Sequence, residues 1–69
     1  MNEKQAALVN MIAEKYGFKP EQIKPETKLG YASEEIATWF VFAYTKERVV
    51  LVVNDMENCT VNDLLEQLE

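Results

Sequence analysis

The sequence has no histidine, one cysteine and only two glycines among its 69 residues. Without histidine, a serine or cysteine nucleophile lacks its usual general base, which excludes Ser-His-Asp and Cys-His sites. The single cysteine, Cys59, cannot form an internal disulfide or complete a Cys/His metal site, and is most simply a small buried hydrophobe. Gly17 and Gly30 alone cannot build a phosphate-binding loop. The sequence therefore predicts a protein that is not an enzyme, with no catalytic residues and no metal site.

Long apolar runs are also missing. No stretch approaches the roughly 18 consecutive apolar residues of a membrane span, and residues 1–17 lack the apolar centre of a signal peptide. Twelve acidic residues against seven basic ones give a net charge of −5, which opposes binding to nucleic-acid phosphates and to anionic lipid. We expect a cytoplasmic protein with no membrane span and no nucleic-acid partner, whose partners present basic surfaces.

What the sequence does contain is enough apolar side chains for one small core. Hydrophobic residues make up 48% of the chain, including three Phe, three Tyr and one Trp. Each large side chain contributes about 1.5–3 kcal/mol when it is fully buried. We expect residues 1–69 to form a single domain near the lower size limit for independent folding.

The first part of the chain predicts an amphipathic helix over residues 3–16, because apolar side chains such as Leu8 and Ile12 recur at helical spacing. Gly17 follows as a C-terminal cap. The next segment predicts a long loop in which Pro20 begins a single helical turn.

The last part of the chain predicts a second terminal helix. Thr60 is placed to cap it, and Asp63, three residues on, completes a capping box. Its apolar positions form one stripe: Val61, Leu64, Leu65 and Leu68.

The middle of the chain allows two interpretations. Trp39 to Tyr44 and Val49 to Val53 are aromatic and β-branched runs that favour strands, so a hairpin over residues 38–53 would give an α+β fold of α-β-β-α order. Against a hairpin, Lys46-Glu47 lacks the Gly or Asn of a tight turn, and one apolar face would stay bare without a dimer partner. The preferred interpretation is a helix with Ser33 as its N-terminal cap. This interpretation predicts a mostly α protein that is monomeric.

Three segments together resemble the acyl carrier protein family. They are Tyr16-Gly17-Phe18, the loop Lys19-Pro20-Glu21-Gln22-Ile23-Lys24-Pro25-Glu26-Thr27, and Cys59-Thr60-Val61-Asn62-Asp63-Leu64-Leu65-Glu66. Between them, Leu29-Gly30-Tyr31-Ala32-Ser33-Glu34 keeps the Leu-Gly and the serine spacing of the family motif L-G-x-D-S-L. The resemblance implies a small three- to four-helix acyl-carrier-like bundle, and the chain would be a divergent member of the family.

The resemblance also implies a function and a site. Ser33, the only serine, would be the cofactor-binding residue and would carry 4'-phosphopantetheine, which presents an acyl or aminoacyl group to carrier-dependent enzymes. The chemistry would then belong to the prosthetic group. Glu34, Glu35 and Ile36, at the start of the second helix, would be the partner-binding residues that dock on basic enzyme surfaces.

The motif around the serine departs from the family pattern. Ala32 replaces the acidic residue before the serine, and Glu34 replaces the apolar residue after it. If the helix is aligned on its apolar positions instead, Ile36 takes the place of the leucine and Glu35 falls where the serine belongs. The alternative function is therefore an unmodified interaction domain of carrier-like fold. The surplus of apolar residues between Trp39 and Val53 suggests that it could self-associate.

Overall fold

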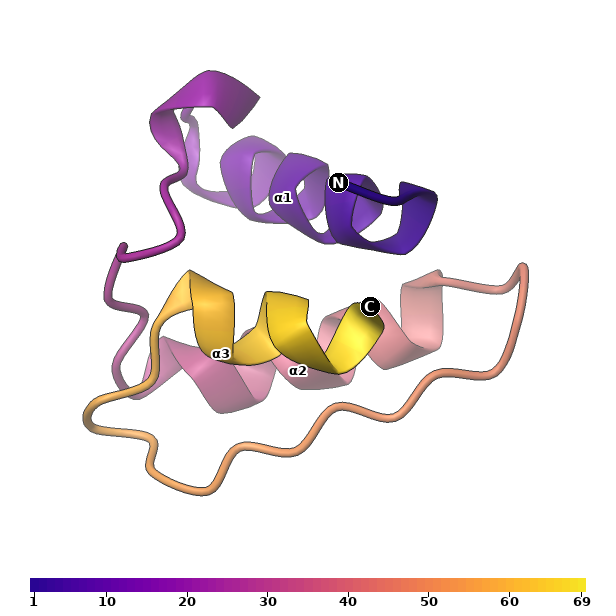
Figure 1. Cartoon of the computed structure of the whole chain (residues 1–69). Coiled ribbons are helices and arrows are strands. Elements are labelled where there is room, and N and C mark those ends of the chain that lie inside the picture. Colours follow the sequence, from indigo (N-terminus) through magenta and orange to yellow (C-terminus); the bar gives the residue numbers. More distant parts are fainter.

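Three α-helices and two single-turn 3-10 helices make up the regular structure in the computed structural model, which describes all residues 1–69 (Figure 1). Helix α1 spans Glu3–Tyr16, α2 spans Ala32–Ala43 and α3 spans Val61–Leu65. The 3-10 helix η1 covers Pro20–Gln22 in the first loop. The second 3-10 helix, η2, spans Glu66–Leu68 and continues α3; α3 and η2 together are called the C-terminal helix. The mostly α fold class is confirmed. The longest helix has 14 residues, and none of the helices could span a bilayer.

Helix α1 has the predicted bounds because both of its ends are capped. The Gln5 backbone N–H donates to Asn2 Oδ1 at 2.8 Å, and the Asn2 N–H donates to Gln5 Oε1 at 2.9 Å, which forms a capping box. At the other end Gly17 has φ +75°, a left-handed conformation that glycine adopts without strain, and its N–H bonds to the Ala13 carbonyl. The sequence predicted the glycine cap but not the cap at Asn2.

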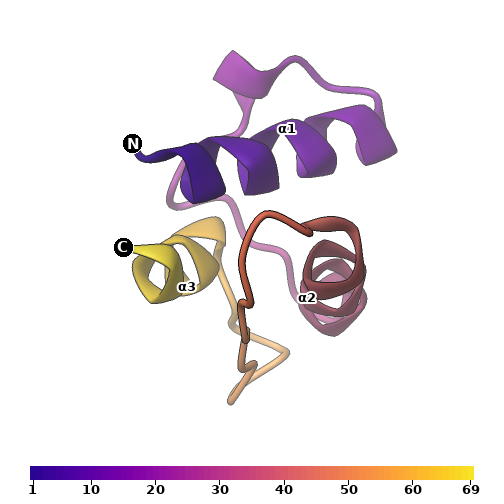
Figure 2. The same cartoon turned by 90° about the vertical axis from the view of Figure 1, so that its right-hand side faces the viewer.

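The core lies where α1, α2 and the C-terminal helix meet (Figure 2). The predicted stripe of the last helix is confirmed, since all four of its apolar side chains are buried. Twelve hydrophobic residues form the buried set: Leu8, Val9, Ile12, Ala13, Ile36, Ala37, Phe40, Cys59, Val61, Leu64, Leu65 and Leu68.

Polar contacts hold the two ends of the chain together. Asn2 Nδ2 donates to the Leu68 carbonyl at 2.7 Å, and Gln5 Nε2 donates to the Leu65 carbonyl at 3.0 Å. The last carbonyls of a helix have no partner within the helix. The first turn of α1 therefore satisfies carbonyls at the end of the C-terminal helix, and the termini lie on the same side of the molecule.

The first loop is fixed to the start of α3 by backbone hydrogen bonds. The Leu29 N–H donates to the Cys59 carbonyl at 2.8 Å, and the Val61 N–H donates to the Thr27 carbonyl at 2.9 Å. The predicted turn at Pro20 is confirmed by η1, and the predicted cap of α3 is confirmed by the capping box of Thr60 and Asp63. The loop thus positions the beginning of α2 against the beginning of α3.

The alternative α-β-β-α fold, with a hairpin at residues 38–53, is wrong. Helix α2 continues through Ala43, and residues 48–53 form one extended segment with no strand beside it; the single β-bridge, between Lys28 and Thr60, lies elsewhere. The helix prevails because it buries Ile36, Ala37 and Phe40 on one face.

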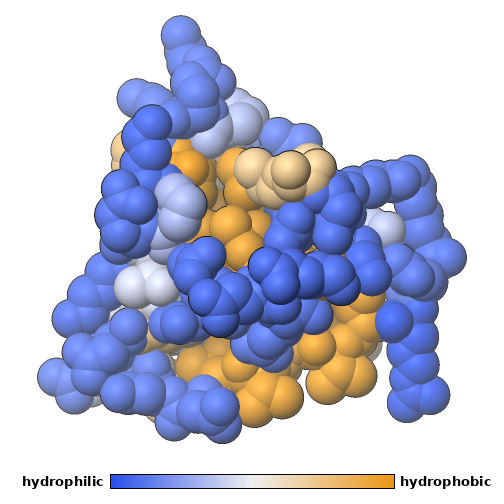
Figure 3. Space-filling view, viewed as in Figure 1, coloured by the Kyte–Doolittle hydropathy of each residue, from blue (hydrophilic) through white to orange (hydrophobic).

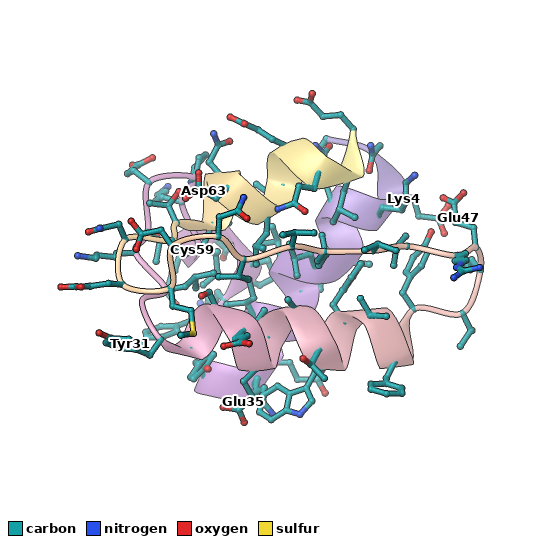
Figure 4. The ribbon with its side chains drawn as sticks, turned by 90° about the horizontal axis from the view of Figure 1, so that it is seen from below. Lys4, Tyr31, Glu35, Glu47, Cys59 and Asp63 are labelled. Carbon is teal, nitrogen blue, oxygen red and sulfur yellow. The ribbon has the colours of Figure 1, made fainter.

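The segment of residues 48–53, called the extended segment below, crosses the underside of the core between α2 and the C-terminal helix (Figure 4). Val49, Leu51 and Val53 are partly buried against the core, whereas Val50 and Val52 between them are exposed. This alternation is the two-residue period of a β-strand. The segment therefore closes the core without forming a sheet.

Candidate functional site

Ser33 lies in the core. It is the second residue of α2, its exposure is 0%, and its hydroxyl has no hydrogen-bond partner. The prediction that it caps the helix is wrong. The Ser33 N–H donates to the Gly30 carbonyl at 3.1 Å, so the turn before it runs directly into the helix, and Tyr31 occupies the cap position without a side-chain bond. Ser33 consequently shares the buried helix face with Ile36 and Ala37, three and four residues on.

The Cys59 thiol is also buried and lies near the Ser33 side chain. Burial raises the pKa of the Cys59 thiol, and the nearby Ser33 side chain opposes that shift more weakly. No regular hydrogen bond joins the thiol to Ser33 Oγ, and the thiol's own donor contact is a long one, 3.6 Å, to the Thr60 carbonyl. Cys59 is thus a buried, protonated thiol, in agreement with the prediction of a small hydrophobe.

The position of Ser33 does not fit attachment of 4'-phosphopantetheine. A transferase has to reach the hydroxyl with a phosphate donor, and the product carries a charged group that must stay in water. Ser33 Oγ is enclosed by the core and directed away from solvent. The first turn of α2 would have to open before the group could be added.

The three residues expected to bind partners have different environments. Ile36 is completely buried, so it supports the core and is not available to a partner. Glu34 and Glu35 are both exposed, but Glu34 lines a groove, whereas Glu35, labelled in Figure 4, does not line it and shares its side of the helix with Trp39, four residues on. An exposed Glu35 followed by a buried Ile36 matches the alignment in which Glu35 stands at the serine position.

A groove of about 350 Å³ runs between α2 and the extended segment. Its walls are apolar apart from Glu34 and Thr38, and they consist of Glu34, Ala37, Thr38, Val41, Phe42, Val50, Leu51 and Val53. Hydrophobic side chains gather along the lower edge of the molecule in Figure 3, where the extended segment runs in Figure 1. We call this feature the α2 groove.

Exposed apolar side chains border the α2 groove. Phe42 is 80% exposed and Val50 is 66% exposed. Isolated exposed apolar residues are ordinary, but a cluster of them beside a concave surface is typical of an interaction site. The groove is therefore a candidate binding site.

The backbone of the extended segment is hydrogen-bonded to the rest of the chain at one residue, Val52. The Val52 N–H donates to Gln67 Oε1 at 2.8 Å, and Gln67 Nε2 donates to the Val52 carbonyl at 2.8 Å. The amide of Gln67 thus imitates one residue of a neighbouring strand. Residues 48–53 have no backbone–backbone hydrogen bond.

The sequence contained part of the signal for this site. The run from Val49 to Val53 indicated a strand, and its local conformation is indeed extended. Because all five residues are apolar, their pattern did not show which face would be buried. Gln67, a polar residue of the last helix, gave no sign that it would pair with Val52.

Comparison of the chain with protein-family models, with curated proteins and with solved structures gave no match. No group of three or more Cys, Asp or Glu side chains is arranged to hold a metal ion. The resemblance to acyl carrier proteins therefore rests on the sequence motifs, and the groove rests on its own geometry.

Proposed function

We propose that this chain is a protein-interaction domain that acts without a prosthetic group and binds its partner in the α2 groove. The observation that carries the proposal is the open apolar groove with Phe42 and Val50 exposed beside it. Covering such side chains contributes roughly 25 cal/mol for each Å² of apolar surface removed from water. A partner that covers the groove gains this energy, while the free chain does not.

Charge favours a basic partner. The chain carries a net charge of −5, and Glu34 lines the groove itself. Long-range attraction raises the rate of encounter with a basic surface, and salt weakens it. The basic docking surfaces expected from the carrier resemblance remain part of the proposal, although the carrier-dependent enzymes themselves stay a prediction.

The burial of Ser33 supports the unmodified form over the carrier form. A carrier needs its serine at the surface, and this serine has 0% exposure. Glu34 and Glu35 occupy the exposed start of α2 without it. The domain would then share the helical architecture implied by the resemblance while binding proteins through its surface alone.

Nile red binding tests the groove, because a neutral dye is not repelled by an acidic chain. We expect dye fluorescence to rise with the wild-type protein and to lose most of that rise in Phe42→Ala. Tyr31→Ala is the matched control, since Tyr31 is an aromatic residue that is 70% exposed and lies outside the groove. Equal loss in both variants, or no rise at all, would contradict the proposal.

Treatment with a promiscuous phosphopantetheinyl transferase tests the unmodified state in the same preparation. We expect the intact mass to stay unchanged while an acyl carrier protein added to the reaction gains its phosphopantetheine. A gain on the wild type that Ser33→Ala abolishes would restore the carrier function.

A further inference from the structure

We infer that the α2 groove binds an extended peptide of the partner, which adds as a β-strand to the free edge of residues 48–53 and places a basic residue beside Glu34. The inference rests on the proposed function and specifies the chemistry of the partner. It starts from the backbone, because the extended segment has the shape of a strand but lacks the hydrogen bonds of one.

The contacts of Val52 show which edge of the segment is free. In an extended chain, the N–H and C=O of one residue point to the same edge, and those of the next residue point to the opposite edge. Both groups of Val52 face Gln67 on the C-terminal helix. The corresponding groups of Leu51 and Val53 therefore face α2, and both residues line the groove.

The opposite wall of the groove is formed by α2, and its side chains are the surface on which an added strand would rest. A partner strand lies about 4.8 Å from its neighbour and must rest on whatever lies beneath it. The α2 wall there is made of small or short side chains, Ala37, Thr38 and Val41. An added peptide would pair with Leu51 and Val53 on one side and cover this part of α2 with its own side chains. Backbone pairing of this kind is a recurring mode of peptide recognition.

A second copy of the chain does not fit the same place. Its own extended segment has α2 beside the corresponding edge (Figure 4). If two copies paired antiparallel through these edges, the core-facing sides of both extended segments would lie on the same face of the two-stranded sheet. The α2 helix and core of one copy would then clash with those of the other. A segment without a flanking helix avoids this clash, which favours a peptide from another protein.

The two ends of the groove differ in charge. Helix α2 and the extended segment run in opposite directions (Figure 1), which puts Glu34 at the Val53 end and Phe42 at the Val50 end. A Lys or Arg of the peptide would meet Glu34, and the apolar residues after it would approach Phe42. The expected ligand is thus an extended peptide with a basic residue at one end and apolar residues at alternate positions.

Amide hydrogen exchange of the ¹⁵N-labelled full chain, measured by NMR, tests this arrangement. The probe is the synthetic peptide Lys-Val-Thr-Val-Thr-Val, acetylated and amidated at its ends. At saturation we expect exchange at Leu51 and Val53 to slow by about tenfold, with Val50 and Val52 unchanged. Equal protection at all four amides, or protection at none of them, would overturn the inference.

Charge reversal supplies a matched pair of variants. Glu34→Lys should weaken binding of the peptide by about fivefold or more at low salt, whereas Glu35→Lys, which changes the net charge equally, should leave it within about twofold. Both residues are exposed in the first turn of α2, so the effect on the helix is the same for both. Equal weakening by the two variants would remove Glu34 from the site.

The outcomes separate this inference from the proposed function. If the peptide shifts the resonance of Phe42 but gives no alternating protection, the groove binds partners and strand addition is wrong. If protection of Leu51 and Val53 rises with protein concentration in the absence of peptide, a second copy is the occupant and the inference is wrong. If neither Nile red nor the peptide binds, both proposals fail.

Discussion

The helices and residues 45–53 differ in how their backbones are held. The structure has 36 backbone–backbone hydrogen bonds, and none of them involves residues 45–53. The helices satisfy their own groups and are capped at Asn2, Gly17 and Thr60. The part without backbone bonds is held by side chains, so the two regions should respond differently to substitution.

The side-chain contacts of the second region are of unequal strength. Val49, Leu51 and Val53 pack on the core, and Gln67 binds Val52. The ion pairs Lys46–Glu3 and Lys4–Glu47 join the preceding turn to α1 at the surface. Such surface pairs contribute little to stability. Packing against the core therefore stabilises this region more than its ion pairs do, and its backbone stays available to a partner.

The largest expected difference in the free energy of unfolding is between alanine variants of two phenylalanines of α2. Phe40→Ala should lower the free energy of unfolding by about 3–5 kcal/mol, because Phe40 is buried between α1 and the C-terminal helix and stacks on Tyr44. Phe42→Ala, two residues on, should change it by no more than about 0.5 kcal/mol. Urea unfolding followed by circular dichroism measures both.

This pair tests the boundary between the two regions. A domain of this size has roughly 3–10 kcal/mol of stability, so Phe40→Ala should lose a large share of it. A loss for Phe42→Ala as large as that for Phe40→Ala would mean that the groove is packed in solution and is not an open surface.

The next largest effects are on the free energy of unfolding of two variants in the helical region, one at a serine and one at a threonine. The two changes have opposite signs. Ser33→Ala should raise the free energy of unfolding by about 1 kcal/mol, because it removes a buried hydroxyl with no partner. Thr60→Ala should lower it by about 1 kcal/mol, because Thr60 caps α3. Thermal and urea unfolding of both variants give the comparison. A loss of stability in Ser33→Ala would mean that its hydroxyl is bonded and that α2 begins as the sequence suggested.

The ends of the chain could be predicted from the sequence because their signals are local. Gly17, Thr60 and Asp63 mark helix ends by conformations and hydrogen bonds within a few residues. The middle was harder because its apolar residues suit both a helix and a strand, although the helix was the preferred interpretation. The outcome there was set by tertiary contacts, above all the burial of Ile36 and Phe40.

The site was less predictable than the fold. The exposure of Glu34 and Glu35 could be expected from their charge, but the burial of Ser33 depends on where α2 begins, which is two residues before the expected start. The groove depends on the extended segment lying beside α2, so that Val53 and Ala37 line the same space, and no local pattern encodes this arrangement. Sequence reasoning therefore found the residues at the start of α2 but not the surface on which they act.

The smallest expected effect lies in the extended segment itself. Gln67→Ala removes both bonds to the Val52 backbone, and it should lower the global free energy of unfolding by about 1 kcal/mol or less because the contact is exposed. Exchange at the Val52 amide should become as fast as at Val50, since its only partner is lost. Gln22→Ala is the control, because Gln22 makes its side-chain bond far away, to the Lys19 N–H in the first loop. If Val52 kept its protection in Gln67→Ala, another group would have to bond its backbone in solution, and the division into a bonded and an unbonded region would no longer hold.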